Sequence, residues 1–153
     1  MVDYDTSLIG RVFPSPNVVT VTAKMIADYC AATYDTNPLY TNPEVAENGP
    51  YGGIVAPPGF AATFRDREHI FQQIPRFAGG GLAAGMDVEF GLPIRAGDSI
   101  TIESQLKEIY EKTGRTGTMV FIVFRSTLKN QHREVVAHID HRFMRRPEPR
   151  ARG

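Results

Sequence analysis

Apolar and polar residues alternate along the second half of the chain, and this period of two is typical of β-strands. The alternation predicts four strands, at 86–94, 100–111, 118–127 and 135–143. The third of these is apolar on both faces, which indicates a central strand. Short segments with turn signals join the strands, at 96–98, 113–117 and 129–132. Long strands in succession favour an antiparallel sheet.

The first half of the chain instead carries helical spacing. Thr22 is placed to cap a helix at Ala23–Thr33, and Asn42 to cap a short helix that begins at Pro43. A further helix is predicted from Pro57 to about Gln72. Its apolar residues and interspersed alanines favour a buried position against the sheet. The predicted class is therefore α+β, with one buried helix lying across a curved antiparallel sheet.

Composition narrows the classes of function. A chain of 153 residues with 42% hydrophobic residues suits one domain with a real core. The 17 basic and 17 acidic residues balance, so we expect no nucleic-acid partner and no attraction to an anionic membrane. The chain shows neither the layout of a signal peptide nor an apolar run of about 20 residues, the length that spans a bilayer. A cytoplasmic location is the expectation.

The single cysteine, Cys30, has no partner for an internal disulfide and is expected to be a buried, small hydrophobic residue. Cysteine and histidine residues do not cluster at zinc spacing, so we expect no metal. The domain is expected to span residues 1–146, followed by a disordered basic tail at 147–153.

Four motifs occur in order along the chain. Asp35-Thr36-Asn37-Pro38-Leu39-Tyr40 follows the first helix, and Gly53-Ile54-Val55-Ala56-Pro57-Pro58 precedes the second. The turns at 93–98 and 113–117 come later. Together they make residues 20–145 resemble the MaoC-like family of acyl-thioester dehydratases and hydratases. The closest resemblance is to the dehydratase-like subunits and N-terminal halves whose Asp/His motif is degenerate.

The resemblance implies a single hot-dog fold, in which the curved sheet wraps around the buried helix. It also implies reversible hydration of an enoyl thioester, with water held by an Asp and a His and the thioester oxygen bound by a backbone N–H at the start of that helix. The activity is that of a hydro-lyase or of a subunit of one. It requires no cofactor, because coenzyme A or the phosphopantetheine of a carrier protein is part of the substrate. Asp35 and Tyr40 occupy the catalytic positions, and the expected substrate-binding residues are Asn37, Pro38, Tyr51, Gly59, Phe60 and Phe64.

Tyr40 stands where active members carry His, and the two side chains differ in chemistry. A phenol with an ordinary pKa of about 10 is almost fully protonated at neutral pH, whereas imidazole, at about 6.5, exchanges protons readily. Tyr40 therefore suits hydrogen-bond donation to water or to the thioester oxygen. Pro57 and Pro58 lack N–H groups, so the first backbone donors of the helix are Gly59 and Phe60. Both departures favour an acyl-binding subunit that works beside a catalytic MaoC-like partner.

Other interpretations stay open. Asp35 is either the base that activates water or a loop residue that binds its own backbone. Four histidines are alternative bases, although solvated or strand-face positions are the ordinary outcome for them: His69, His132, His138 and His141. The arginines from Arg142 onward suit either the phosphates of coenzyme A or solvent.

Three functions follow: a subunit of a heterodimer, a self-sufficient homodimeric hydratase that uses Asp35 and Tyr40, or a non-catalytic thioester-binding protein. Pairing with a second subunit is expected because a single hot-dog domain exposes an edge strand.

Overall fold

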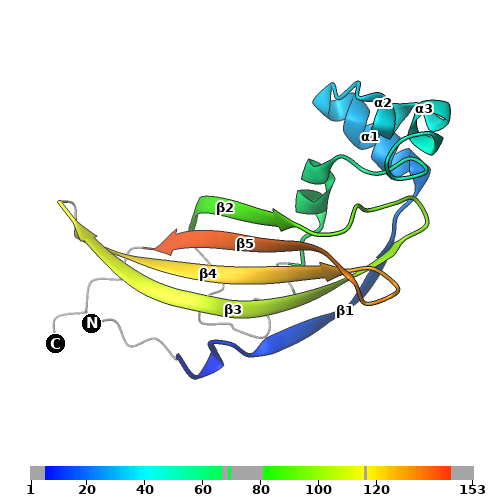
Figure 1. Ribbon diagram of the computed structural model, residues 1–153. Coiled ribbons are helices and arrows are strands. Elements are labelled where there is room, and N and C mark those ends of the chain that lie inside the picture. Colours follow the sequence, from blue (N-terminus) through cyan, green and yellow to red (C-terminus); the bar gives the residue numbers. More distant parts are fainter. Residues whose placement is uncertain (1–5, 67–68, 70–80, 116, 146–153) are drawn as a thin grey trace, which may run out of the picture.

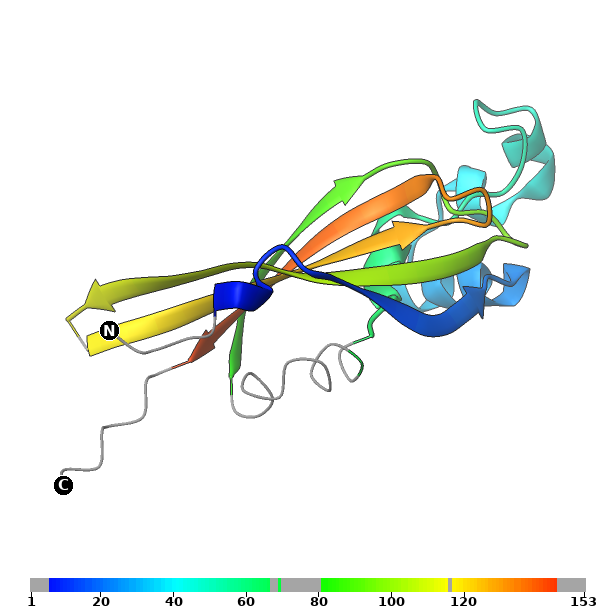
Figure 2. The same cartoon turned by 90° about the horizontal axis from the view of Figure 1, so that it is seen from below.

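A five-stranded antiparallel sheet forms the body of the protein (Figure 1). The computed structural model describes residues 6–66, 69, 81–115 and 117–145. The spatial order of the strands is β1-β3-β4-β5-β2. Their bounds are β1 Val12–Thr20, β2 Leu82–Phe90, β3 Ser99–Gly114, β4 Gly117–Lys129 and β5 Val135–Arg145. The strands twist along their length (Figure 2).

The α-helices of the described residues gather at one end of the sheet, away from the β3–β4 turn (Figure 1). They are α1 Ala23–Thr33, α2 Pro38–Thr41 and α3 Pro43–Glu47. The Thr22 side chain accepts a hydrogen bond from Met25 N at 3.1 Å, and Asn42 accepts one from Val45 N at 3.2 Å. The predicted caps of α1 and α3 are thereby confirmed, because each satisfies an N–H that the helix itself leaves unpaired.

The prediction of a helical first half missed one strand, because β1 precedes α1. Its sequence obscures the strand, since Pro14 and Pro16 interrupt the alternation. β1 lies at the edge of the sheet, where proline is tolerated, and its pairing with β3 shifts register between Pro14 and Val18.

The helix predicted to begin at Pro57 takes a different form. The described residues form a short 3-10 helix, η2 (Pro58–Thr63), and Phe64 is extended. Residues 67–68 and 70–72 of the predicted helix lie outside the described residues, as does the predicted tail at 147–153. Burial is as predicted for Phe60, Ala61 and Phe64, which belong to the hydrophobic core. The core side of the sheet therefore meets η2 where a continuous helix was expected.

The strand predicted at 86–94 begins earlier and ends earlier, as β2 Leu82–Phe90. Alternation there does not mark a buried face, because Leu82 is 67% exposed, Met86 43% and Phe90 54%. β2 is an edge strand, so its apolar side chains lack a neighbouring strand on one side. Ile94, which was assigned to the same strand, lies in the following loop and is buried.

The main hydrophobic core joins α1, η2 and one face of the sheet. Cys30 is buried there, as predicted, together with Ile26 and Phe60. β4 is apolar on both faces over part of its length, with Ile122, Val123 and Phe124 all buried, which confirms its central position. In the part of the chain that the structure describes, no helix is long and apolar enough to cross a membrane.

A charged cluster surrounds Asp140 on β5, which is only 7% exposed. Arg125 donates two hydrogen bonds to its carboxylate, at 2.7 and 2.9 Å, and Lys107 donates one at 2.5 Å. Burial alone would raise the pKa of Asp140, but these bonds and charges outweigh it and hold the pKa below its ordinary value. A carboxylate whose pKa is lower in the folded than in the unfolded chain stabilises the fold at neutral pH. That stabilisation is present above the unfolded value of about 3.9 and is lost as the pH falls through the folded value.

We therefore predict that Asp140→Asn lowers the free energy of unfolding by about 1–3 kcal/mol at pH 7, because Arg125 and Lys107 lose their shared partner. Denaturant unfolding measures this loss, and the gap to the wild type should narrow as the pH falls below about 4. Asp28→Asn is the matched control, because Asp28 pairs with Lys24 in an exposed bridge on α1. Equal losses in the two variants would contradict the assignment.

Candidate active site

The loop that follows α1 is held by its own side chains. Asp35 N donates to Cys30 O at 2.9 Å, and Asn37 N donates to the Asp35 carboxylate at 3.0 Å. Asn37 in turn accepts from Leu39 N at 3.0 Å and so caps α2, in which Pro38 is the first residue. One oxygen of the Asp35 carboxylate therefore binds the backbone of its own loop, as the loop interpretation predicts. Asn37 and Pro38 set the course of the backbone that carries Tyr40.

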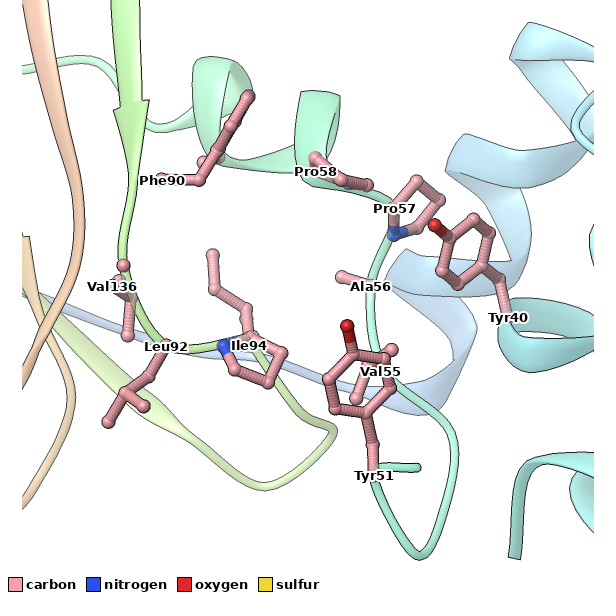
Figure 3. Close-up of a pocket in the computed structure, with 13 residues that line it drawn as sticks. Tyr40, Tyr51, Val55, Ala56, Pro57, Pro58, Phe90, Leu92, Ile94 and Val136 are labelled. Atoms are coloured by element: carbon pink, nitrogen blue, oxygen red, sulfur yellow. The ribbon is translucent and has the colours of Figure 1, made fainter. Parts of the chain in front are cut away.

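A pocket of about 160 Å³ lies between this loop and the end of β2 (Figure 3). One wall comes from residues 55–58 and 61, and the facing wall from residues 90–94 and 136. Tyr40 and Tyr51 contribute the phenol rings. Because the walls are apolar and the two phenols supply the polar side chains of the described lining, the pocket suits a short apolar group that carries a polar atom at one end.

The two walls are joined by a short antiparallel contact. Val55 pairs with Arg95 as an isolated bridge, and Ala56 N donates to Ile94 O at 2.8 Å. The Arg95 guanidinium also donates to Tyr51 O at 2.5 Å. Arg95 thus fixes both the Pro57 segment and the loop that carries Tyr51.

Hydrogen-bonding groups in the pocket are few. Among the lining residues that the structure describes, the polar side chains are the phenols of Tyr40 and Tyr51. Three backbone N–H groups of the lining are already engaged: Ala56 with Ile94 O, Gly91 with Val136 O at 3.0 Å, and Leu92 with Val135 O at 3.1 Å. In Figure 3 both hydroxyl groups are directed toward the Ala56–Pro57 segment.

Tyr40 is half-buried, and its surroundings favour the neutral phenol. Burial raises its pKa above the ordinary value, and the negative charge of Asp35 raises it further, followed by Tyr51 and Cys30. Tyr40 and Asp35 also share the lining of a second, more open groove of about 550 Å³ along α1. Tyr40 therefore stands where the pocket meets the groove that contains Asp35, and it holds its proton there.

The remaining predicted substrate-binding residues, Gly59, Phe60 and Phe64, are not part of the pocket lining. Phe60 and Phe64 pack edge to face in the core, and Phe60 packs in the same way against Tyr29. The N–H of Phe60 donates to Pro57 O at 2.9 Å, so this candidate donor is engaged within η2. Gly59 contacts the Tyr29 hydroxyl so closely that an added Cβ would lie 2.5 Å from it.

The sequence interpretation missed one wall of the pocket. Phe90, Leu92 and Val136 lie far from the Asp35 loop in sequence, and nothing in their spacing links them to it. The turn motif at 93–98 was the available signal, because it contains Arg95. Of the alternative bases, His138 hydrogen-bonds Thr127 at 3.0 Å across β4 and β5, and His132 lies in an exposed turn. Neither lines the pocket.

No group of three or more His, Cys, Asp or Glu residues within the described ranges is placed to hold a metal ion.

Sequence comparison places this site in a known family. Residues 7–139 match the model of the FAS1-like dehydratase domain region. The chain belongs to this family. The UPF0336 protein of Streptomyces avermitilis is 32% identical over 114 residues, which cover 72% of this chain and 76% of that relative. The match of the dehydratase region contains Asp35, Tyr40 and Tyr51.

Solved structures of the same shape confirm the hot-dog fold of this dehydratase-region chain. The C-terminally truncated HadBC complex (3R-hydroxyacyl-ACP dehydratase) of Mycobacterium tuberculosis has a TM-score of 0.76 and 19% identity, and the match covers 93% of this chain and 100% of that one. The (R)-hydratase from A. caviae has a TM-score of 0.68 and 19% identity, with 94% and 100% covered. The predicted resemblance to MaoC-like dehydratases is thereby confirmed.

The close contact between Gly59 and Tyr29 leaves no room for a larger side chain at residue 59. Gly59→Ala should lower the free energy of unfolding by about 1–3 kcal/mol, because its methyl group displaces a Tyr29 ring that is packed against Phe60. The double variant Gly59→Ala/Tyr29→Phe should recover part of the loss, since it removes the clashing hydroxyl. Gly114→Ala is the control, because an added Cβ there meets nothing within 4 Å. Thermal unfolding of the variants measures the effect, and a double variant no more stable than Gly59→Ala would contradict this packing.

Proposed function

We propose that the protein is the acyl-binding subunit of an acyl-thioester hydratase or dehydratase. The observation that carries this proposal is the state of Tyr40. The position that transfers protons in active MaoC-like enzymes holds a phenol whose pKa is raised, at the mouth of an apolar pocket. Such a site binds the acyl group and its carbonyl but lacks an efficient proton carrier.

The dimensions of the pocket support a thioester ligand. A cavity of about 150 Å³ holds a benzene-sized molecule, so the 160 Å³ pocket accepts an acyl chain of similar bulk. The thioester would lie at the phenols, with coenzyme A or a carrier-protein phosphopantetheine extending outward. The lining residues of the pocket and of the groove carry no cationic side chain among those described, which suits the neutral pantetheine portion.

A second hot-dog subunit with an intact Asp/His pair would supply the proton transfer. Support comes from β2, which is the last strand in the described sheet and whose Leu82, Met86 and Phe90 side chains are exposed in the single chain. An exposed apolar edge strand is a site for pairing with another chain. HadBC, which this chain resembles in fold, is itself a complex.

A self-sufficient homodimeric hydratase is the second candidate. It is favoured by one observation, the presence of Asp35 and Tyr40 in the lining of the same groove. In that case Asp35 activates the water and Tyr40 donates a hydrogen bond to it or to the thioester oxygen. The two candidates differ in the activity of the purified chain alone.

Purified protein alone should bind crotonyl-CoA yet hydrate it barely above the uncatalysed rate, because Tyr40 holds its proton. Loss of absorbance of the enoyl thioester measures the reaction, and calorimetry measures binding. Tyr40→His should raise the rate, since imidazole exchanges protons near neutral pH. The gain should remain at least ~100-fold short of a full hydratase, the usual cost of a missing donor to the oxyanion, because Pro57 and Pro58 offer no N–H.

Asp35→Asn in the Tyr40→His background is the control, and it should remove the gained activity by at least ~100-fold while leaving binding nearly intact. Wild-type protein that matches the rate of Tyr40→His would overturn the subunit proposal in favour of the homodimeric enzyme. Binding without turnover, even beside a MaoC-like chain that carries the full motif, would leave a non-catalytic thioester-binding protein.

A further inference from the structure

The polar side chains of the described pocket lining are the phenols of Tyr40 and Tyr51, which can donate hydrogen bonds to a thioester carbonyl. A carbonyl that leaves water for an apolar pocket needs a hydrogen-bond donor, since an unpaired one costs free energy comparable to a lost hydrogen bond. We propose that Tyr51 and Tyr40 together bind the thioester oxygen, so that a pair of phenols replaces the backbone N–H donor of the MaoC-like site. This inference rests on the proposed acyl-thioester function and adds Tyr51 as a carbonyl-binding residue.

Several backbone groups around the pocket cannot serve as donors. Pro57 and Pro58, at the start of η2, have no N–H groups, and the Phe60 N–H is engaged with Pro57 O. The N–H groups of Ala56, Gly91 and Leu92 are also engaged in hydrogen bonds.

The backbone of Tyr51 is held beside the pocket. Tyr51 lies in the turn that follows α3, and its carbonyl oxygen accepts a hydrogen bond from the Arg95 guanidinium at 2.5 Å. Arg95 is itself bridged to Val55 across the pocket. Figure 3 shows the Tyr51 and Tyr40 hydroxyl groups, one carried by the turn after α3 and the other by α2, both pointing toward the Ala56–Pro57 segment of the pocket wall. A carbonyl oxygen has two lone pairs, so it accepts from two such donors at once.

The pair also suits the chemistry of the bound thioester. Addition of water at C3 places negative charge on the thioester oxygen, and neutral phenols stabilise that charge by donating hydrogen bonds without giving up their protons. No bond to either tyrosine forms or breaks. The two residues would bind the ground-state carbonyl modestly and the enolate-like oxygen more strongly.

Two ligands that differ at one atom separate this role from general packing. Butyryl-CoA carries the carbonyl oxygen, and S-butyl-CoA, the thioether, lacks it. Calorimetry with the purified chain should give tighter binding of butyryl-CoA. Tyr51→Phe and Tyr40→Phe should each weaken butyryl-CoA binding roughly two- to tenfold, the usual value of one hydrogen bond, and leave S-butyl-CoA binding unchanged. The double variant should bind the two ligands equally.

Tyr110→Phe is the matched control, because Tyr110 stacks on Phe121 in the sheet, outside the pocket lining. Infrared spectroscopy of butyryl-CoA labelled with carbon-13 at the carbonyl gives a second readout. Its stretching frequency should fall on binding to wild-type protein, and less so in either Phe variant.

The possible failures are distinguishable. If wild-type protein binds neither ligand, the acyl-thioester function falls and this inference falls with it. If wild-type protein binds butyryl-CoA and Tyr51→Phe binds it equally well, with the same carbonyl frequency, the function stands and the phenol pair is overturned. A variant that weakens both ligands alike would show that Tyr51 packs against the acyl chain and does not bind the carbonyl, which also overturns the inference.

Discussion

The short antiparallel contact between residues 55–56 and 94–95 is the constraint on which the site depends. It joins the segment that leads into η2 to the loop that follows β2, and so brings together two stretches that are distant in sequence. Arg95 extends the contact through its guanidinium, which holds the backbone of Tyr51. Without this contact the distance between the two apolar walls would not be fixed. The Ala56–Pro57 segment, toward which both phenols point, would not be held in place. Ile94 belongs to the same hydrophobic core as Ile100 and Val136 of the sheet, which supports this contact.

The protonation state of Tyr40 depends on where the surrounding loop and helix place its ring. The segment from Asp35 to Tyr40, which leads into α2, is held by Asx-type hydrogen bonds that position the Tyr40 ring at the mouth of the pocket and keep Asp35 nearby. Burial and the neighbouring carboxylate both favour the protonated phenol. The same geometry that would make a histidine here a strong base makes a tyrosine here a persistent donor. Under the proposed function, such a site would bind an acyl thioester and rely on other residues, or on another chain, to move protons.

Much of the fold was predictable from the sequence, because local patterns determined it. The alternation in β3 to β5 and the caps Thr22 and Asn42 gave the correct element types. β1 was hidden by Pro14 and Pro16, whose tolerance depends on an edge position that the sequence does not show. The prediction of a regular helix from Pro57 was wrong at Phe64, because Phe64 is extended and packs against Phe60 in the core.

The candidate site was only half predictable. The motif containing Asp35 and Tyr40 is local, and the family resemblance identified it. The facing wall, from Phe90 to Ile94, depends on long-range pairing that no short motif records. Whether Gly59 and Phe60 bind substrate, as predicted, stays a prediction. The structure places Gly59 against Tyr29 and Phe60 in the core, with its N–H engaged.

The pKa of Tyr40 tests the central claim most directly, because the claim is that this phenol stays protonated and donates. Carbon-13 labelling of the tyrosine Cζ atoms, with Tyr40→Phe to assign the signal, gives the pKa from chemical shifts across an alkaline titration. The account predicts that Tyr40 titrates above the ordinary value of about 10, and that Asp35→Asn lowers the pKa toward that value, since it removes the neighbouring negative charge. A pKa well below 10 would make Tyr40 a proton carrier and would contradict the account.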